Sequence, residues 1–414
     1  MYKKVRGMRD IYGEEVEYFK YISEIAENIF SLYGYNKIIV PIIEKTELFQ
    51  RGVGEDTDVV EKEMYSFQDK SGRNITLRPE GTAGVVRSYI ENGQHKADPV
   101  QKYYYIGPMF RYEKPQKGRY RQFFQIGVEV FGIKSPLIDV EIIYMLIQFL
   151  KELGLDNLKV NLNNMGCGKC RKKYIKKLKK YMFKHKSALC DTCQRRLESN
   201  PLRILDCKKC GKKQFIKNTP RIIDNLCDSC LEFNEKLMNY IEEFKIPYSI
   251  DHSLVRGLDY YTNTVFEIIA EDLDSSQNQI VGGGRYNDLV STLGGVERPG
   301  LGFAFGFDRL VDLVMEKELE IKDKKPSVFI AWYLNDKNEL LKFANKLRSD
   351  GIKIDFKYKQ VNFSNQLRYA DKNNFDYVIF YGEKEMKSED IHIKNMKSGE
   401  EKNIKFKNLK KFIK

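Results

Sequence analysis

Apolar residues recur at helical spacing near the start of the chain, over residues 14–33. They are Val16, Phe19, Ile22, Ala26, Ile29 and Tyr33. This spacing predicts an amphipathic helix, and Gly34 directly after it is a common helix terminator. The run KIIVPII (37–43) that follows predicts a strand. Because Pro41 has no backbone N–H to donate, we expect this strand at a sheet edge or at an interface.

Further short runs of apolar and β-branched residues predict an antiparallel sheet. Strands are expected at residues 75–80, 102–112, 123–132, 262–270 and 279–285. Most of these strands are joined by hairpin-like turns. The pattern therefore predicts an α+β fold, in which helices flank a largely antiparallel sheet, rather than a doubly wound parallel sheet.

The last part of the chain follows a different pattern. A helix is expected from Arg309 to about residue 318, and the charged run 316–326 has the composition of a linker. Beyond it, the strand-like runs SVFIAWY, IKIDFK and YVIFYG alternate with helical segments. This alternation is typical of a small α/β domain with a mainly parallel sheet.

One predicted strand has a polar face. Between Phe124 and Val130 apolar and polar positions alternate strictly, so Gln125, Gly127 and Glu129 share one side of the sheet. Gly127 between the two polar residues leaves room for a ligand to lie on the sheet. The alternative is a polar face that is merely exposed to solvent.

Arginines and glycines gather in three segments near this strand. The segment FRYEKPQKGRYRQ (110–122) is strongly basic, and LVRGLDYYTNTVFEI (254–268) places Arg256 on a glycine-containing turn before Tyr260 and Tyr261. An arginine fork suits phosphate oxygens, and tyrosine rings suit a small aromatic ligand. The third segment, IVGGGRYNDLVSTLGG (280–295), is followed by PGLGFAFGFDRL (299–310). Its glycines allow a ligand to approach the backbone closely.

Composition limits the class of protein. The chain has 414 residues, of which 42% are hydrophobic and 31% charged, as in soluble globular proteins of two or three domains. No apolar run approaches the roughly 20 residues of a membrane span, and the first residues contain no apolar signal core. We therefore expect a cytoplasmic protein without a membrane partner. The net charge of +13 favours a polyanionic partner such as nucleic acid, although an AT-rich genome also produces lysine-rich chains.

All eight cysteines lie between residues 165 and 231, in four CxxC pairs. The pairs are Cys167 and Cys170, Cys190 and Cys193, Cys207 and Cys210, and Cys227 and Cys230. Nineteen residues separate the first pair from the second and 16 separate the third from the fourth, which fits the spacing of zinc ribbons. Two CxxC turns supply the four thiolates of a tetrahedral site. Crossed pairing is also compatible, since sequence does not set the connectivity.

Three other uses of the cysteines are an iron–sulfur cluster, disulfides and redox chemistry. Disulfides are rare in cytoplasmic proteins, and a thioredoxin-like site needs one CxxC at a helix start rather than four. Four thiolates without an open position predict a structural metal, so we expect two Zn²⁺ ions in this segment.

Taken together, these stretches resemble histidyl-tRNA synthetase, a class II aminoacyl-tRNA synthetase, over almost the whole chain. GYNKIIVPIIEKTELF resembles the first class II motif, FRYEKPQKGRYRQFFQIGVEVFG the second and GFAFGFDRL the third. RGLDYYTNTVFE and GGGRYNDL resemble the two histidine-specific signatures. The resemblance implies an enzyme that activates L-histidine with ATP and Mg²⁺, and passes the histidyl group to tRNA(His). It also implies a homodimer, with the proline of the first motif at the interface.

The resemblance further implies roles for individual residues. Arg111 and Arg256 would hold the α-phosphate and act as the catalytic residues. ATP would contact Arg111, Arg119, Tyr120, Phe123 and Arg309, with Arg309 and Phe123 on either side of adenine. Histidine would be bound by Glu80, Thr82, Gln125, Glu129, Tyr260 and Tyr261. Glu129 and Tyr261 would meet the imidazole, whereas the other contacts include the α-ammonium group. The Thr82 hydroxyl alternatively caps the helix that follows it.

The resemblance implies a division of the chain into domains. Catalytic parts at 1–164 and 232–318 would flank a cysteine-rich insertion at 165–231, and a linker at 319–326 would lead to an anticodon-binding domain at 327–414. The cysteines depart from most members of the family. Lysines around an apolar stripe at 171–186 suggest a helix that follows the tRNA backbone, or simply a solvated face.

Two other departures concern single residues. In RGMRDIYG, Met8 and Gly13 stand where the family usually has threonine and proline, and in NFSNQLRYAD, Ser364 and Asn365 stand where basic residues are frequent. Two competing interpretations are a synthetase-like regulator of histidine biosynthesis and a zinc-dependent RNA-binding module. The intact arginine and tyrosine signatures and the C-terminal domain favour the enzyme over both.

Overall fold

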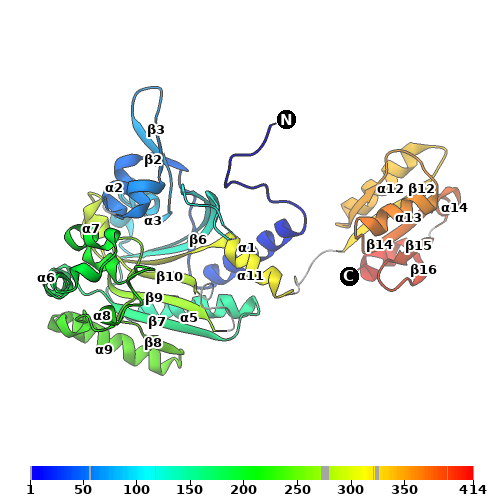
Figure 1. Cartoon of the computed structure of the whole chain (residues 1–414). Coiled ribbons are helices and arrows are strands. Elements are labelled where there is room, and N and C mark those ends of the chain that lie inside the picture. Colours follow the sequence, from blue (N-terminus) through cyan, green and yellow to red (C-terminus); the bar gives the residue numbers. More distant parts are fainter. Residues whose placement is uncertain are drawn as a thin grey trace. The chain divides into compact units, whose positions relative to one another are not determined.

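The chain forms two compact units, Met1–Leu319 and Glu320–Lys414 (Figure 1). The computed structural model describes residues 2–55, 57–116, 118–271, 279–319, 321, 326–388 and 390–413. Most of the linker predicted at 319–326 falls outside these ranges. None of the described helices is long and apolar enough to cross a membrane.

The first unit is built on an eight-stranded sheet. Its order is β1 (Asn36–Lys37), β5 (Gln101–Phe110), β6 (Gln122–Phe131), β11 (Gly300–Gly306), β10 (Gln279–Arg285), β9 (Thr262–Ala270), β7 (Leu158–Asn164) and β8 (Tyr248–Ile250). All pairs are antiparallel except the outermost ones, β1 with β5 and β7 with β8. The predicted α+β architecture with a largely antiparallel sheet is therefore confirmed.

The strand predicted at residues 37–43 was wrong in extent. Only Asn36–Lys37 joins the large sheet, whereas β2 (Ile43–Lys45) pairs with β4 (Asn74–Leu77), which also pairs with β3 (Tyr65–Gln68). Between the two sheets, the carbonyl of Val40 accepts a hydrogen bond of 3.0 Å from Arg78 Nη1. The carbonyl of Ile42 accepts one of 2.9 Å from the Arg78 backbone. Arg78 thus supplies the hydrogen bonds to residues 40 and 42 that a neighbouring strand would otherwise make, on either side of Pro41.

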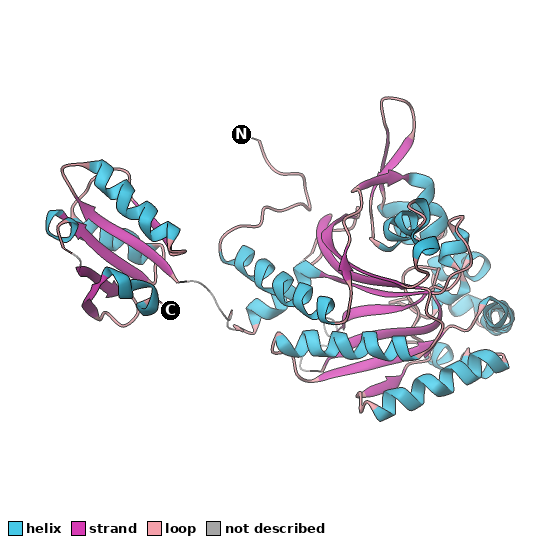
Figure 2. Ribbon diagram, turned by 180° about the vertical axis from the view of Figure 1, so that it is seen from behind, coloured by secondary structure: helices cyan, strands magenta, loops and turns pink. Residues whose placement is uncertain are grey.

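Helices cover one face of the large sheet. They include α1 (Glu14–Leu32), α5 (Leu137–Glu152) and α11 (Phe307–Glu316), which lie in front of the strands in the view from behind (Figure 2). The Phe30 ring lies 5.8 Å from Phe149 and 6.0 Å from Phe303, centroid to centroid. Because side chains alternate along β11, its large phenylalanines point to these helices, and Gly302 and Ala304 point to the other face. That other face is covered only in part, where Tyr89 of α3 (Thr82–Glu91) stacks on Phe131 of β6.

The cysteine-rich segment forms a small helical cluster. It contains α6 (Gly168–Phe183), α7 (Asp191–Ser199), a 3₁₀ turn (Pro201–Ile204), α8 (Gln214–Lys217) and the start of α9 (Asp228–Glu243). The apolar stripe predicted on the lysine-rich helix buries Tyr174, Leu178 and Met182. This core continues without a break into Leu254 and Tyr261 of the same unit, outside the cysteine-rich segment.

The second unit is a five-stranded mixed sheet with helices. Its order is β13 (Lys353–Phe356), β12 (Ser327–Tyr333), β14 (Tyr377–Gly382), β15 (Asp390–Asn395) and β16 (Glu401–Lys405), with α12 (Lys337–Ser349) and α13 (Phe363–Lys372). The first three strands are parallel, as predicted, but β15 and β16 are antiparallel and were not predicted. Gln366 is fully buried, and its amide bonds the Trp332 backbone. It joins α13 to β12.

A fully buried ion pair ties β10 to α5. The side chains of Arg285 and Asp139 are 1% and 0% exposed, and Arg285 Nη2 lies 2.6 Å from Asp139 Oδ2. The same guanidinium donates to the carbonyls of Ile133 and Ser135 at 2.9 and 2.7 Å. Removing one member of such a pair leaves an uncompensated buried charge.

We expect Asp139→Asn to lower the free energy of unfolding of the first unit by about 3 kcal/mol, measured by urea denaturation. The double variant Asp139→Leu/Arg285→Met, which removes both charges, should recover much of this loss. The control is Glu24→Gln, because the Lys20–Glu24 pair is exposed and should contribute little. An Asp139→Asn protein as stable as this control would contradict the interpretation.

Candidate active site

Two adjoining cavities lie on the face of the large sheet opposite α1, α5 and α11. The larger has a volume of about 620 Å³ and the smaller about 310 Å³. Both are lined by Arg111, Glu113, Arg119, Gln125, Arg256, Gly282 and Ala304. Two arginines that the resemblance assigned to phosphate, Arg111 and Arg256, therefore stand where the cavities meet.

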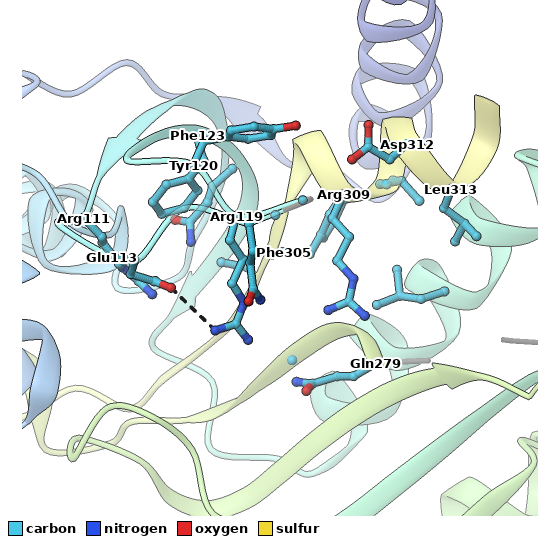
Figure 3. A pocket seen from close by; sticks show the side chains of 18 of the residues that line it. Arg111, Glu113, Arg119, Tyr120, Phe123, Gln279, Phe305, Arg309, Asp312 and Leu313 are labelled. Atoms are coloured by element: carbon cyan, nitrogen blue, oxygen red, sulfur yellow. Dashed lines mark ion pairs between the residues drawn. The ribbon is translucent and has the colours of Figure 1, made fainter. Parts of the chain in front are cut away.

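The residues expected to contact ATP line the larger cavity, as Figure 3 shows. They are Arg111, Arg119, Tyr120, Phe123 and Arg309. The Arg111 guanidinium lies 5.4 Å from the centre of the Phe123 ring, and Arg119 pairs with Glu113 at 3.5 Å. Burial and the neighbouring Arg119 charge lower the pKa of Arg309. So much positive charge around one cavity favours an anionic occupant.

The residues expected to contact histidine line the smaller cavity, with one exception. Glu80, Thr82, Gln125, Tyr260 and Tyr261 line it, whereas Glu129 lies behind Thr82 and Tyr286. Thr82 Oγ1 donates to Glu129 Oε1 at 2.7 Å, and the Tyr286 hydroxyl donates to Glu129 Oε2. Burial raises the pKa of the Glu129 carboxyl to about 8, against these two hydrogen bonds, which lower it.

Glu80 takes the helix-capping role that was an alternative for Thr82. The Glu80 carboxylate accepts hydrogen bonds from the backbone N–H groups of Thr82 and Ala83, at 2.8 and 2.9 Å, at the start of α3 (Thr82–Glu91). The Thr82 hydroxyl is thereby free to donate to Glu129. Within the part of the chain that the structure describes, no donor reaches the buried Gln125 Oε1. That oxygen is available to a ligand in the cavity.

Glycines make room for functional side chains rather than for a ligand at Gly127. A Cβ on Gly127 would lie 2.3 Å from Tyr105 Cζ, so the space expected for a ligand there holds the Tyr105 ring. A Cβ on Gly302 would lie 2.1 Å from Glu129 Oε2, and one on Gly282 would lie 2.1 Å from Arg256 Nη2. The glycines of β10 and β11 thus allow two charged groups to lie against the sheet.

Tyr105 and Tyr286 were missed by the sequence analysis. Tyr286 follows the triple glycine of β10, and its ring lies 5.6 Å from Tyr260 in an edge-on arrangement. Tyr105 stands opposite Gly127 in the pairing of β5 with β6, and its hydroxyl lies 3.4 Å from Glu129 Oε1. A tyrosine opposite a glycine on the polar face was the available signal for Tyr105.

The N-terminal segment contacts the site despite its departures from the family pattern. Arg9 donates to Asp308 at 2.7 Å and lies 4.3 Å from the centre of the Tyr120 ring. The carbonyl of Gly7 accepts a hydrogen bond of 2.7 Å from the backbone of Arg121. The segment therefore braces the basic loop without the family's usual threonine.

The cysteines form two clusters with nested pairing. One holds Cys167, Cys170, Cys227 and Cys230, and the other holds Cys190, Cys193, Cys207 and Cys210. The pairing of consecutive CxxC turns suggested by the spacing is therefore wrong: the first turn meets the fourth, and the second meets the third. Its physical reason is that α6 and α9 begin side by side, so the first and last pairs of the segment meet.

The geometry of both clusters fits a tetrahedral metal. The sulfurs of each cluster all lie within 4.8 Å of one another, and three of the Sγ–Sγ distances are 3.7, 3.9 and 4.0 Å. A Zn–S bond of about 2.3 Å requires sulfurs about 3.8 Å apart. Backbone N–H groups of Cys227 and Cys190 also donate to the sulfurs of Cys170 and Cys210, at 3.1 and 3.3 Å. These contacts stabilise thiolates.

Comparison with known proteins agrees with this arrangement. The family profile "Histidyl-tRNA synthetase" matches residues 7–310, and "Anticodon binding domain" matches residues 328–414. The histidine–tRNA ligase of Thermodesulfovibrio yellowstonii is 47% identical over 399 residues, covering 96% of this chain and 94% of that protein. The one from Dictyoglomus thermophilum is 48% identical over 407 residues, covering 98% and 97%.

A solved structure extends the likeness to three dimensions. The crystal structure of apo S. aureus histidyl-tRNA synthetase superimposes with a TM-score of 0.80 and 37% identity, covering 100% of both chains. The sheet, the arginine-lined cleft and the relatives of nearly equal length agree, and the chain belongs to the histidyl-tRNA synthetase family.

Proposed function

We propose that the protein activates L-histidine with ATP and transfers the histidyl group to the 3′ end of tRNA(His). Pyrophosphate leaves in the first step and AMP in the second. The observation that carries this proposal is the position of Arg111 and Arg256, which line both cavities of the cleft. ATP in the larger cavity and histidine in the smaller would meet between these two arginines.

The chemistry of activation suits fixed positive charge. The histidine carboxylate is already a nucleophile, so attack on the α-phosphate needs no general base. The barrier lies in bringing two anions together and in stabilising the crowded, negatively charged phosphorus. Arg111 and Arg256 would hold the α-phosphate oxygens, and each is oriented before ATP arrives. Arg111 Nε donates to the carbonyl of Pro79 at 2.8 Å, and Arg256 pairs with Glu267.

The remaining residues of the larger cavity would hold the rest of ATP. We assign adenine to the space between Phe123 and Arg309, and the phosphates to Arg119 and the neighbouring Tyr120. Mg²⁺ would enter with ATP and screen the phosphate charge. The carboxylates of Glu113, Asp312 and Glu316 line this cavity and offer the oxygen ligands that Mg²⁺ prefers.

The smaller cavity would select histidine through its imidazole. Glu129 would accept a hydrogen bond from one ring nitrogen and Tyr261 would meet the other, while Glu80, Thr82 and Gln125 would hold the α-ammonium group. Tyr260 forms the aromatic wall. An amino acid without these ring nitrogens would leave buried polar groups unpaired, which costs far more affinity than a misfit in an apolar pocket.

We propose further that the two cysteine clusters each bind a structural Zn²⁺ ion. The domain boundaries given above, with the insertion at 165–231 and the anticodon-binding domain at 327–414, are part of this proposal. We also propose a homodimer that works in the cytoplasm, where ATP and tRNA occur. Around Pro41 of the first motif, Ile39, Ile42 and Ile43 are 86%, 42% and 45% exposed in the single chain, and a second copy would cover them.

The first test is amino-acid-dependent exchange of pyrophosphate into ATP, measured with all 20 amino acids in parallel. We expect exchange with histidine alone, because only histidine can satisfy both Glu129 and Tyr261. No exchange with any amino acid, in a folded protein that still binds tRNA, would favour the regulator or the RNA-binding module instead.

A second prediction concerns the charge of Glu129. Its pKa is raised to about 8, so in the free enzyme the carboxylate forms only as the pH rises through that value. We expect kcat/KM for histidine to rise with an apparent pKa near 8, before the α-ammonium group of free histidine loses its proton at higher pH. Glu129→Gln should lower kcat/KM by about 100-fold and abolish the rise. Glu141→Gln, at a partly exposed ion pair with Lys102 outside the cavities, is the control. A rise near pH 8 that persists in Glu129→Gln would contradict the assignment.

A third prediction concerns the metals and their pairing. Elemental analysis of the purified protein should find about two Zn²⁺ ions per chain, with thiols that react only after chelation. Because Cys170 and Cys227 share a cluster, the double variant Cys170→Ser/Cys227→Ser should lose one ion and keep the other. Consecutive pairing would make the same variant lose both ions. Eight freely reacting thiols in the native protein would refute metal binding altogether.

A further inference from the structure

The segment Val255–Tyr261, which contains Arg256 and Tyr261, lies outside any helix or strand. It connects the turn after β8 to the start of β9, on the side of the cleft that faces the cysteine-rich insertion. Among the described residues, no backbone N–H group donates to the carbonyls of this segment. A residue that must aim at a phosphate within a fraction of an ångström needs some other support.

The insertion supplies that support through its side chains. Arg171 Nη1 donates to the carbonyls of Asp259 and Tyr261, at 2.7 and 3.3 Å. Arg203 Nη1 donates to the carbonyl of Arg256 at 2.9 Å. The segment is thus held from two directions, by one arginine on α6 and another in the 3₁₀ turn after α7.

A third contact holds the middle of the segment. Asn200 Nδ2 donates to Asp259 Oδ2 at 2.7 Å, and a backbone bond of 3.1 Å joins Asp259 to Val53 of the catalytic unit. Arg203 and Arg196 also approach Asp58, at 4.0 and 2.6 Å. The insertion is therefore fixed to the wall of the cleft as well as to the segment.

Each supporting residue is close in sequence to a cysteine cluster. Arg171 directly follows Cys170, and its backbone N–H bonds the carbonyl of Cys167 at 2.9 Å. Asn200 and Arg203 lie between Cys193 and Cys207, on the connection that the inner cluster closes. On the far side of Tyr261, Asn263 Nδ2 donates to Cys230 Sγ at 3.5 Å. The outer cluster therefore fixes the position of Arg171, and the inner cluster fixes the connection that carries Asn200 and Arg203.

We infer that Arg171, Asn200 and Arg203 are positioning residues, which hold the segment Val255–Tyr261 so that Arg256 and Tyr261 reach into the cleft. The cysteine clusters keep these three residues in place. The insertion thereby acts on histidine activation itself, independently of any contact with tRNA. This inference rests on the proposed function, because that proposal assigns Arg256 to the α-phosphate and Tyr261 to histidine.

The burial of these supports distinguishes them from the lysines of the same helix. The side chain of Arg203 is 11% exposed, and burial lowers the pKa of Arg171. Both side chains donate to neutral carbonyls. Lys172, the next residue of α6, is exposed. A buried arginine that donates to backbone carbonyls fixes the position of that backbone, whereas an exposed lysine adds positive charge to the surface.

The test uses the full-length, metal-loaded protein with Arg171→Met and Arg203→Met, which keep most of the aliphatic stem. Lys172→Met and Arg195→Met remove the same charge from exposed positions of α6 and α7 and serve as controls. Three properties are measured: KM and kcat for histidine in pyrophosphate exchange, tRNA(His) affinity, and hydrogen–deuterium exchange of residues 254–263.

We expect each arginine variant to raise KM for histidine roughly tenfold and to speed amide exchange in residues 254–263. Its tRNA affinity should equal that of its charge-matched control. Arg171→Lys and Arg203→Lys, which keep one donor, should recover part of the loss. A titration of active sites corrects each kcat for the folded fraction.

The inference is overturned if the arginine variants and controls share the same KM and the same amide exchange. It is also overturned if only the active fraction falls, since that is the result of a purely structural role. Absence of histidine-dependent exchange in the unmodified protein would refute the proposed function instead. In that case the comparison of amide exchange between the arginine variants and their controls still tests whether Arg171 and Arg203 hold residues 254–263 in place.

Discussion

The buried carboxyl group of Glu129 determines how separate elements are arranged around the smaller cavity. A carboxylate removed from water costs several kcal/mol unless hydrogen bonds compensate for the lost hydration. Here the donors come from separate elements: Thr82 begins α3, and Tyr286 follows β10. Each donor is thereby held in place by the carboxyl group to which it donates. One group thus fixes the start of a helix and the end of a strand around the smaller cavity.

The Glu129 side chain also requires that a neighbouring position carry no side chain. Glu129 lies against Gly302, and any Cβ there would collide with the carboxylate. On β11 the alternation of small and large residues satisfies two demands at once, since Phe303 and Phe305 pack against the helices on the opposite face. Gly282 of β10 likewise leaves room for the Arg256 guanidinium, because a Cβ there would collide with it. The glycines of these strands are a consequence of placing charge against a sheet.

The parts of the fold that depend on local periodicity could be predicted from the sequence. The strands expected at 262–270 and 279–285 are found with those bounds, and the strand expected at 123–132 is shifted by one residue. The segment 37–43 could not be predicted, because its carbonyls bond Arg78, a partner distant in sequence. The antiparallel strands β15 and β16 were not predicted because they are short and their apolar residues are limited to Ile391, Ile393 and Ile404.

The candidate site divides in the same way. Residues with a recognisable motif, such as Arg111, Arg256 and Arg309, line the cleft as the resemblance implied. Tyr105 was missed, because its relation to Glu129 depends on the register of two strands. Cysteine spacing identified four turns but not their partners, since a CxxC turn fits any second turn that the fold brings near. The nested pairing arises because α6 and α9 begin side by side, and cysteine spacing does not predict that arrangement.

Nested pairing explains how an insertion can interrupt a catalytic unit and still help to build it. Cys167 and Cys227 are 60 residues apart in sequence, yet their sulfurs lie 4.0 Å from each other. A cross-link that closes a loop of this length removes roughly 4 kcal/mol of chain entropy from the unfolded state. A metal at the outer cluster would close the insertion where it leaves and rejoins the catalytic unit. The inner cluster would then order the connection that carries Asn200 and Arg203. With a metal in each cluster, α6 would be a rigid part of the cleft wall. Arg171 would then hold the segment that contains Arg256 through its hydrogen bonds to the carbonyls of Asp259 and Tyr261.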